Sequence, residues 1–378
     1  MMKKLERNKV SFVMDPELGG GPRNVFKLST LLNEVGFSSN ILSFKGMSYV
    51  DHFLNRRGYH NYYGAKRMEP KNLLSLIYTF TEIGDNVNTL FYPIFLFNQF
   101  ILNPITLSAY PKPDIYIATA WQSFIPTSRI SKRDSIPMMY YVQADETEFS
   151  DNLIYKREAT KTYVNDTLKF TQSKWLVDEF KNKFDVELNY IGFGIDHNKF
   201  YPRGNNPEKI LFTIARGERI KGFPIFVRAV NRLWKMRHDF RVLIAGSKSA
   251  IDKEHIKFPY DYLGWISNDE HLAELYSRTI FVNTGLNETL PMPPLEAMAC
   301  GGCVVMSSNG GSIEYTKNRE NCLLTKPGDD KGLTETLDFA LSSNSIRETM
   351  RLEAIRTAKK YEWKDVLNNL ILLINREI

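Results

Sequence analysis

Short apolar runs alternate along the chain with longer segments in which apolar residues recur every three or four positions. Apolar runs of four to six residues are typical of strands buried on both faces, and the longer period is typical of helices that pack on them. The predicted strands are 10–14, 115–118, 138–143 and 168–171, then 210–214, 242–245, 280–283 and 303–306. A predicted helix ends at Gly36, and further helices are predicted at 223–234, 270–276 and 293–299. Strands that alternate with helices indicate parallel sheets and an α/β protein.

A polar stretch rich in Pro, Gly and Asn, Phe200–Pro207, interrupts this alternation and is the candidate linker. The 378 residues, 43% of them hydrophobic, exceed what a single core uses, so two domains are expected. The pattern therefore predicts two facing, doubly wound (Rossmann-like) domains, with a ligand cleft at the carboxyl ends of their strands.

Two carboxylates, Glu288 and Glu296, stand eight positions apart in the segment after the predicted strand 280–283. The first lies in a loop at the carboxyl end of that strand, and the second lies in the following helix. Ligands of parallel sheets bind at this end, where helix N-termini offer N–H groups. Such carboxylates accept hydrogen bonds from sugar or ribose hydroxyls. Helix capping is the competing interpretation of Glu296.

Two cations, Arg216 and Lys221, lie in a glycine-containing loop directly after the predicted strand 210–214. Two cations at this spacing could bind a diphosphate from both sides. The alternative interpretation is a basic loop that is simply exposed to solvent. Gly20 and Gly21 follow the first strand in the same way, although this short glycine run lacks the spacing of a dinucleotide fingerprint.

Together these motifs resemble the two-domain GT-B glycosyltransferases, specifically family four, the retaining group with a Glu-x7-Glu motif. The resemblance extends to Gly192–Asp196, Tyr262–Trp265, Gly310–Glu314 and a terminal helix from Trp363. The segments Ala118–Trp121 and Tyr140–Glu146 resemble in particular the rhamnosyltransferases that build cell-surface polyrhamnan.

The resemblance implies an N-terminal acceptor-binding domain at 1–199, the linker at 200–207, and a nucleotide-sugar-binding domain at 208–360. It also implies that the helix at 361–378 packs back on the N-terminal domain. It places Glu288 on the donor sugar and Glu296 on the ribose, with Arg216 and Lys221 on the diphosphate. Gly20 and Gly21 approach the phosphate from the N-terminal domain.

Two features depart from the family pattern. Thr289 and Pro291 occupy positions at which the family usually has glycine, and proline has no N–H to give. Thr289 and Leu290 are therefore expected to contribute to donor binding. Where many relatives have a histidine near the acceptor, this chain has Gln143 and Asp145. Asp145 is a candidate for orienting the acceptor hydroxyl, and capping of its own loop is the alternative.

No resident cofactor and no metal are expected, because the six histidines are scattered and no Asp-x-Asp motif ends a strand. Cys300 and Cys303 have zinc-like spacing, but Cys322 is the only other thiol, so buried apolar roles are expected for all three. An odd number of cysteines fits a reducing cytoplasm.

The charge distribution along the chain leaves two interpretations open, attraction to an anionic membrane surface or phosphate-bearing substrate and an ordinary solvated face. Residues 1–130 hold 14 Lys and Arg against nine Asp and Glu, most of the net charge of +6, which is too little for a nucleic-acid-binding protein. The uncharged stretch Asn86–Pro111 is interrupted too often for a transmembrane helix. A buried helical hairpin or an aromatic segment at the membrane interface remains. Arg56, Arg57, Lys66, Arg67 and Lys71 would add salt-sensitive attraction to an anionic leaflet.

Together with these observations, the resemblance implies a retaining hexosyltransferase, and the closer resemblance implies a rhamnosyltransferase. It would move a sugar from a nucleotide diphosphate sugar to a glycan or lipid-linked glycan acceptor. Polysaccharide or glycoprotein glycan assembly at the inner face of a membrane is the expected setting. A nucleotide-sugar 2-epimerase and a catalytically silent sugar-nucleotide- or glycan-binding subunit are the alternatives.

Overall fold

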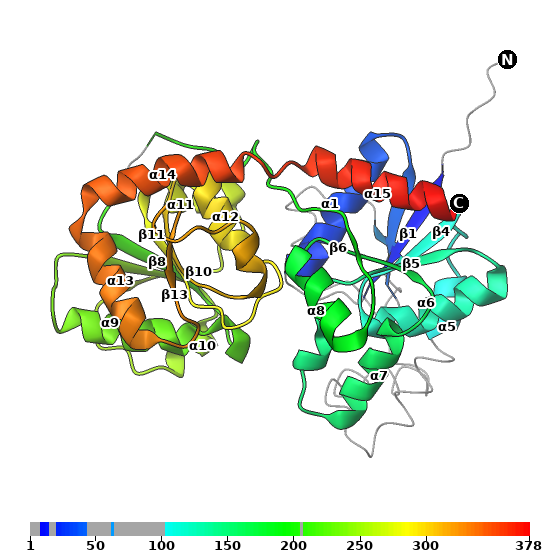
Figure 1. Cartoon of the computed structure of the whole chain (residues 1–378), viewed down its shortest axis with the longest axis horizontal. Coiled ribbons are helices and arrows are strands. Elements are labelled where there is room, and N and C mark those ends of the chain that lie inside the picture. Colours follow the sequence, from blue (N-terminus) through cyan, green and yellow to red (C-terminus); the bar gives the residue numbers. More distant parts are fainter. Residues whose placement is uncertain (1–7, 15–19, 44–61, 64–102, 205–206) are drawn as a thin grey trace, which may run out of the picture. The chain divides into compact units, whose positions relative to one another are not determined.

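The computed structural model describes residues 8–14, 20–43, 62–63, 103–204 and 207–378. The chain divides into two compact units. Unit 1 comprises Met1–Gln172, Leu176–Ile191 and Leu367–Ile378, and unit 2 comprises Ser173–Trp175 and Gly192–Val366. Both are layered α/β structures in which helices cover a parallel sheet (Figure 1). The predicted α/β class with two parallel sheets is confirmed.

The sheet of unit 1 has seven strands in the order β3-β2-β1-β4-β5-β6-β7. Its strands are β1 (Lys9–Val13), β2 (Ser38–Leu42), β3 (Tyr62–Tyr63), β4 (Ile115–Ala118), β5 (Met138–Tyr141), β6 (Leu168–Thr171) and β7 (Asn189–Tyr190), all paired in parallel. From β1 the chain moves outward through β2 and β3, then returns to pair β4 on the other side of β1. Strands β1 and β4 therefore flank a topological switch point, the usual ligand position in such sheets.

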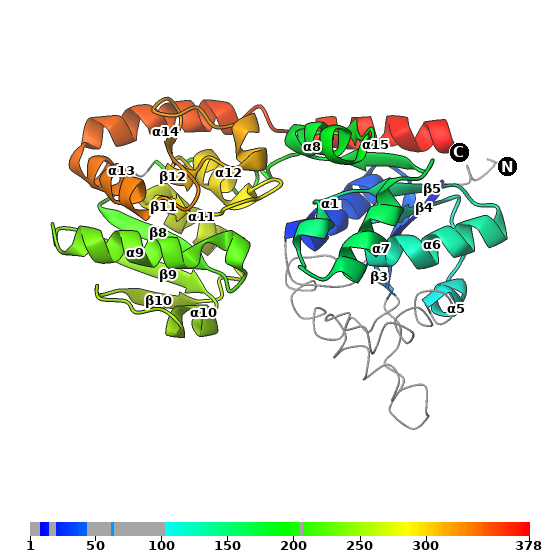
Figure 2. The same ribbon diagram turned by 60° about the horizontal axis from the view of Figure 1, so that its bottom comes forward.

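The helices of unit 1 are α1 (Gly20–Glu34), α5 (Asn103–Ser108), α6 (Trp121–Asp134), α7 (Leu153–Tyr163), α8 (Lys174–Phe184) and most of α15 (Trp363–Glu377), with a 3-10 turn η2 (Glu146–Glu148). Figure 2 shows α5, α6 and α7 together, and α8 packs against α7 through Phe180 and Tyr163, whose ring centroids are 4.7 Å apart. Helix α5 is the described part of Asn86–Pro111. The rest of that stretch, and Arg56, Arg57, Lys66, Arg67 and Lys71, lie outside the described residues. None of the described helices has the length and apolar character needed to cross a bilayer.

The sheet of unit 2 has six strands in the order β10-β9-β8-β11-β12-β13. They are β8 (Ile210–Ala215), β9 (Arg241–Gly246), β10 (Asp261–Gly264), β11 (Ile280–Asn283), β12 (Cys303–Ser307) and β13 (Leu323–Thr325). The helices are α9 (Phe223–Trp234), α10 (Lys248–Asp252), α11 (Asp269–Arg278), α12 (Met292–Ala299), α13 (Asp330–Ser342) and α14 (Asn344–Ala358), with 3-10 turns η3 (Arg219–Lys221) and η4 (Gly310–Glu314). The switch point here lies between β8 and β11.

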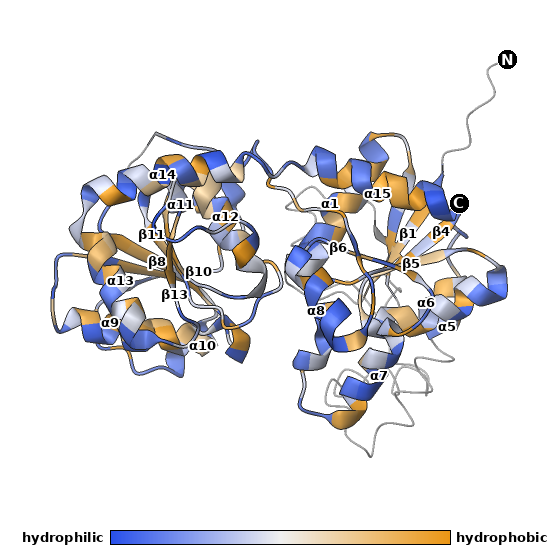
Figure 3. Ribbon diagram, viewed as in Figure 1, coloured by the Kyte–Doolittle hydropathy of each residue, from blue (hydrophilic) through white to orange (hydrophobic). Residues whose placement is uncertain are grey.

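Alternate residues of the unit 2 strands belong to two separate cores. Cys303 and Val305 of β12 pack with α9 and α13, whereas Val304 and Met306 pack with α11 and α12. This two-residue alternation follows from the pleat of a strand that is covered on both faces. In Figure 3 the strands are correspondingly apolar, and the helices carry polar residues on their outer sides.

The boundary between the units differs from the predicted one. The chain passes from unit 1 to unit 2 at Ile191–Gly192, so 192–199 belong to unit 2 and 200–207 do not separate the units. The reason is packing: Phe193 and Phe200 are buried in the core of unit 2, and the Phe193 ring stacks on Tyr361 at 4.4 Å. Residues 363–366 at the start of α15 also belong to unit 2, and Leu367–Ile378 group with unit 1.

Candidate functional site

The loop between β8 and α9 holds Arg216 and Lys221, both of which are paired with carboxylates. The guanidinium of Arg216 donates to Glu218, with Nη2 at 2.6 Å and Nε at 3.4 Å from its carboxylate oxygens. Burial opposes ionisation of Glu218, but Arg216, together with the charge of Lys221, lowers the pKa of this carboxyl below its ordinary value. The loop therefore presents its cations as part of a charge network, rather than as a solvated basic surface.

Lys221 links this loop to the loop that follows β11. Its Nζ donates to Oε1 of Glu288, and the two residues are 67 positions apart in the sequence. The Glu288 residue is 7% exposed, and its other oxygen, Oε2, accepts from Asn283 Nδ2 at 3.2 Å. Gly285 makes room for this carboxylate, because a Cβ at that position would lie 2.5 Å from Oε2. The predicted motif residues Lys221 and Glu288 are thus brought together at the switch point.

Gly222 ends the turn η3 in a left-handed conformation, with φ of 66°. A Cβ there would overlap the carbonyl oxygen of Thr284, so only glycine lets the backbone after Lys221 approach the loop after β11 this closely. The Thr284 hydroxyl donates to the Gly222 carbonyl at 2.9 Å. This contact holds the two loops in register and places Lys221 beside Glu288.

The turn η4 supports the segment 288–291 from its other side. The backbone N–H of Gly311 donates to the Glu288 carbonyl at 3.0 Å, and the Tyr315 hydroxyl donates to the Pro291 carbonyl at 2.6 Å. Burial, and then the negative charge of Glu288, raise the pKa of Tyr315 well above its ordinary value, so this hydroxyl stays protonated and remains a donor. The backbone of Thr289 and Leu290 is consequently fixed beside Glu288.

Helix α12 presents fewer donors at its start than the sequence analysis assumed. Its N-cap is Pro291, and Pro293 and Pro294 occupy the second and third helical positions, so Met292 alone contributes an N–H in that first stretch. The interpretation of this terminus as a source of several N–H groups is therefore wrong. Glu296 lies one turn further on and is buried at 3% exposure, so it is not an N-cap of this helix.

In unit 1, Gly21 and Gln143 lie together at the carboxyl end of the sheet. Gly20 and Gly21 open α1, and a Cβ on Gly21 would lie 2.7 Å from Oε1 of Gln143. The Gln143 amide nitrogen donates to the Thr119 carbonyl at 3.0 Å, while its buried Oε1 has no hydrogen-bond partner among the described residues. An acceptor oxygen held in this way is a suitable partner for a ligand N–H or O–H group.

Asp145 is held in a structural role. Its Oδ1 accepts from the N–H of Thr147 at 3.0 Å and from the Thr147 hydroxyl at 2.6 Å, which caps η2. Its Oδ2 accepts from Lys183 Nζ at 2.5 Å, and the residue is 6% exposed. Of the two interpretations that the sequence left open, these contacts favour loop capping over orientation of an acceptor hydroxyl.

Asp145→Ala is therefore expected to reduce stability more than catalysis. Loss of the cap and of the Lys183 ion pair should lower the free energy of unfolding by about 2 kcal/mol, measured by urea denaturation. Asp151→Ala, which removes an exposed aspartate from the following loop, is the matched control and should change stability little. An Asp145→Ala protein of unaltered stability that has lost sugar transfer would instead restore the acceptor-orienting role.

The described residues contain no group of three or more His, Cys, Asp or Glu side chains arranged to hold a metal ion. Cys300, Cys303 and Cys322 are free and buried, as predicted. Burial raises the pKa of the Cys303 and Cys322 thiols to about 12, which keeps them protonated.

Comparisons with known proteins identify the fold and a related family. Residues 195–360 match the family model described as glycosyl transferases group 1. The chain has the GT-B fold. Sucrose-phosphate synthase from Thermosynechococcus elongatus superposes with a TM-score of 0.74 at 14% identity, covering 98% of this chain and 99% of that one. HepE of Anabaena, solved with UDP and glucose, gives 0.73 at 13% identity over 98% of this chain and 100% of that one.

Two relatives found by sequence comparison are also named as glycosyltransferases. An uncharacterized glycosyltransferase of Methanocaldococcus jannaschii is 28% identical over 173 residues, 43% of this chain and 44% of that protein. The N,N'-diacetylbacillosaminyl-diphospho-undecaprenol alpha-1,3-N-acetylgalactosaminyltransferase of Campylobacter jejuni is 27% identical over 222 residues, 53% of this chain and 58% of that protein. The chain thus spans about half the length of these two relatives. The matched segment of this GT-B chain contains Arg216, Lys221, Glu288 and Glu296.

Sequence reasoning missed several residues of the site. Glu218 lies two positions from Arg216, and this short spacing is the signal that would have found it. Asn283 lies five positions before Glu288, at the end of β11, and its contact depends on how the loop after that strand folds back. Tyr315 gave no such signal, because its contact with Pro291 depends on how the segments after β11 and β12 meet.

Proposed function

We propose that the protein is a retaining glycosyltransferase that moves a hexosyl group from a nucleotide diphosphate sugar to a hydroxyl of a glycan acceptor. The observation that carries the proposal is the Lys221–Glu288 pair at the β8/β11 switch point, inside the segment that matches group 1 glycosyl transferases. A cation and a buried carboxylate side by side suit a ligand that joins a phosphate to a hydroxyl-bearing ring.

When the donor binds, its groups replace the contact between Lys221 and Glu288. Without donor, the Lys221 ammonium compensates the negative charge of buried Glu288. When the donor binds, its diphosphate becomes the partner of Lys221 and Arg216, and sugar hydroxyls replace the ammonium as donors to Glu288. Arg216 leaves the exposed carboxylate of Glu218 to reach the phosphate. Backbone groups of Thr289 and Leu290, fixed by η4, supply further contacts, and Glu296 hydrogen-bonds the ribose.

In the chemical step the bond between the anomeric carbon and the diphosphate oxygen breaks, and its electron pair leaves with the diphosphate. The acceptor hydroxyl oxygen forms the new bond on the same face of the sugar and gives its proton to a leaving diphosphate oxygen. Negative charge grows on the diphosphate during this step, and Lys221 and Arg216 stabilise it more in the transition state than in the ground state. These cations provide the charge stabilisation for which other enzymes use a metal ion, so we propose a metal-independent reaction without a resident cofactor.

The acceptor is proposed to bind to unit 1, at Gln143. The name of the Campylobacter relative describes an undecaprenol diphosphate-linked acceptor, which supports a lipid-linked glycan as the substrate here. We accordingly propose polysaccharide or glycoprotein glycan assembly at the cytoplasmic face of a membrane. We propose rhamnose as the sugar because Ala118–Trp121 and Tyr140–Glu146 resemble segments of rhamnosyltransferases.

One observation favours a second candidate, a binding subunit without catalytic activity. The prolines at 291, 293 and 294 remove N–H donors from the start of α12, where a donor phosphate or sugar would be held. A silent subunit would bind nucleotide sugars and leave them intact, which separates it from the enzyme in a single assay of donor breakdown.

A thermal-shift screen against nucleotide diphosphate sugars tests the binding part of the proposal. A donor at 100 times its Kd adds about 2.7 kcal/mol to the stability of the state that binds it, which gives a clear increase in Tm. UDP-, GDP-, ADP- and dTDP-linked hexoses and 6-deoxyhexoses form the panel, each with the free nucleoside diphosphate for comparison. A flat response to every member would contradict the proposal.

Glu288→Gln and Glu296→Gln are expected to change different kinetic constants. A sugar contact that strengthens in the transition state should lower kcat by about 100-fold, whereas a ribose contact present throughout should mainly raise the donor KM, by about tenfold. Glu335→Gln on α13, an exposed position, is the control and should leave both constants unchanged. Identical profiles for the two buried glutamates would contradict this division of roles.

A further inference from the structure

Gln143 and Gln172 follow two neighbouring strands of the unit 1 sheet. Strands β5 and β6 pair in parallel with Tyr141 opposite Phe170, so the two glutamines, each two positions further along, stand at matching places in the register. The rings of Tyr141 and Phe170 stack with their centroids 5.0 Å apart. Side chains two positions apart in an extended chain point to the same face, so both glutamines lie on the face that carries these rings. Ligands of parallel sheets bind at this carboxyl end of the strands.

Each of these two side-chain amides is only half satisfied. The Gln143 nitrogen donates to the Thr119 carbonyl at 3.0 Å, and its buried Oε1 accepts from none of the described residues. Gln172 is 4% exposed, and its Oε1 accepts from the Tyr141 hydroxyl. The buried Nε2 of Gln172 has no acceptor in the described part of the chain. An acceptor is therefore left on one glutamine and a donor on the other, and a ligand that pairs with both gains affinity.

The ionisable groups next to Gln143 in the sequence are already engaged. Asp145 accepts from Lys183 Nζ at 2.5 Å, and Glu146 accepts from the Tyr140 hydroxyl at 3.1 Å. The two amides themselves carry no charge. A ligand group bound between them is therefore recognised by neutral hydrogen bonds.

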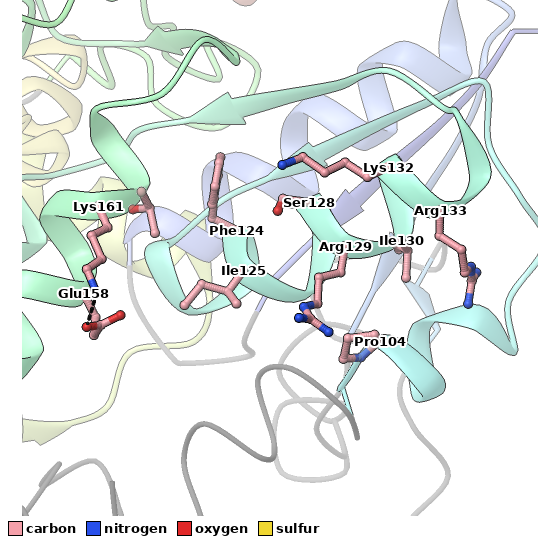
Figure 4. A pocket seen from close by; sticks show the side chains of 11 residues that line it. Pro104, Phe124, Ile125, Ser128, Arg129, Ile130, Lys132, Arg133, Glu158 and Lys161 are labelled. Carbon is pink, nitrogen blue, oxygen red and sulfur yellow. Dashed lines mark hydrogen bonds and ion pairs between the residues drawn. The ribbon is translucent and has the colours of Figure 1, made fainter. Parts of the chain in front are cut away.

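The pocket of about 660 Å³ between α5, α6 and α7 has a different character. Charged side chains line it, and Figure 4 shows the ion pair in which Lys161 donates to Glu158 at 2.8 Å. Arg133, also in its lining, donates to Asp134 at 2.8 Å. These groups are engaged with one another, whereas the two glutamines each keep one atom for a ligand.

A single hydroxyl group matches both unpartnered atoms. Its O–H donates to Gln143 Oε1, and its oxygen accepts from Gln172 Nε2. Neighbouring strands lie about 4.8 Å apart, and two hydrogen bonds of about 2.9 Å each reach that far through one oxygen atom. An ammonium only donates and a carboxylate or ether only accepts, so each would leave one amide atom unpaired. The N–H and C=O of a trans acetamido group point in opposite directions, so that group does not meet two side chains on one face.

We infer that Gln143 and Gln172 bind one and the same hydroxyl of a neutral sugar, which makes Gln172 a specificity-determining residue. The inference rests on the proposed function in one respect, namely that this sugar belongs to the acceptor. A charged group in place of the hydroxyl would be desolvated beside neutral amides and left without a counter-ion. The acceptor class is therefore a glycan with a neutral sugar at this position.

Ligand-observed NMR titration of the full chain, without nucleotide sugar, tests this site. The probes are the methyl α-glycosides of L-rhamnose, D-glucose, D-galactose and D-mannose. The tightest-binding glycoside is then compared with each of its monodeoxy analogues. We expect saturable binding of at least one glycoside and about tenfold weaker binding of the analogue that lacks the bound hydroxyl. An amino group in place of the same hydroxyl should weaken binding at least as much.

Gln172→Met and Gln143→Met replace each amide by an apolar side chain of similar size. Each should weaken binding of the chosen glycoside about tenfold. Neither should weaken binding of the analogue that lacks the bound hydroxyl, because the contact is already absent there. The same analogue should be insensitive to both variants, since the two glutamines share one hydroxyl. Asn368→Leu removes an exposed amide from α15 of the same unit and is the matched control, with no expected change in affinity.

Gln172→Glu is a second variant that keeps an acceptor for the Tyr141 hydroxyl and loses the donor, so it should lose the same affinity. Circular dichroism checks that each variant is folded. An affinity unchanged by the Gln172 variants, two different insensitive analogues for the two glutamines, or no saturable binding of any of the four glycosides would overturn the inference.

Donor turnover does not enter these measurements, so failure of the inference and failure of the proposed function are distinguishable. A protein that binds the glycoside through both glutamines but never breaks down a nucleotide sugar contradicts the proposed function alone. An active transferase in which the Gln172 variants bind the glycoside as the parent does contradicts this inference alone.

Discussion

Lys221→Ala is expected to lower kcat/KM for the sugar donor by about 100-fold, or ~3 kcal/mol of transition-state stabilisation. The ammonium that opposes charge on the leaving diphosphate is lost, and Glu288 loses the partner that holds it in place. The same variant should lose about 1–2 kcal/mol of unfolding free energy, because a carboxylate at 7% exposure keeps, among the described residues, the Asn283 amide as its remaining side-chain donor. Initial rates over a donor concentration series and urea denaturation give the two quantities.

Arg219→Ala is the matched control, since it removes an exposed cation from the same turn, two positions earlier. It should leave both rate and stability close to those of the parent protein. The double variant Lys221→Ala/Glu288→Gln separates the two effects: removal of the uncompensated charge should restore stability, while transfer stays defective. A Lys221→Ala enzyme with the parent's kcat/KM would show that the lysine is a structural partner of Glu288 and not a phosphate ligand.

Gly311→Ala is expected to lower the Tm by about 5–10 °C and to abolish most of the activity, because the new Cβ would overlap the Thr289 carbonyl oxygen. The overlap is with backbone, so relief requires either η4 or the segment 288–290 to shift. A shift of that segment would move Glu288 away from Lys221. Differential scanning fluorimetry and donor turnover measure the two outcomes.

Gly217→Ala is the control for this substitution. No atom lies within 4 Å of a Cβ built at Gly217, and its φ is not in the left-handed region. Its Tm should therefore remain that of the parent or rise slightly, since alanine restricts the unfolded chain. If Gly311→Ala also had the parent's Tm and activity, the close support of 288–290 by η4 would be irrelevant to the site.

The strands at the centre of each sheet could be predicted from the sequence because both of their faces are buried. Ile115–Ala118 and Ile280–Asn283 are uninterrupted apolar or nearly apolar runs, and the structure has strands at these positions. Strand β2 was missed because it begins Ser38-Ser39-Asn40, and Ser39 is buried through a hydroxyl contact with Ser29 at 2.9 Å. Strand β10 lies at a sheet edge with exposed residues, so it lacks an apolar run.

For the candidate site, the spacing of residues within a motif identified candidate side chains, but contacts between residues far apart in the sequence could not be predicted. That Lys221 and Glu288 contact one another follows from a parallel sheet in which β8 adjoins β11, a strand order that was not predicted from the sequence. Asp145 illustrates the limit: its cap to Thr147 is local, but its ion pair with Lys183, 38 positions away, depends on where α8 packs. The domain boundary was misplaced for a similar reason, since Phe200 in a Pro- and Gly-rich stretch is fully buried.

The most direct test of the central claim is time-resolved NMR of the sugar released or transferred when the purified protein is incubated, in EDTA, with the nucleotide sugar that raises its Tm most. We predict formation of the nucleoside diphosphate together with a sugar that first appears in the donor's anomeric configuration, and about 100-fold slower formation of both products by Lys221→Ala. A donor that binds and remains intact, a sugar that first appears with inverted configuration, or turnover that requires a divalent cation would contradict the account.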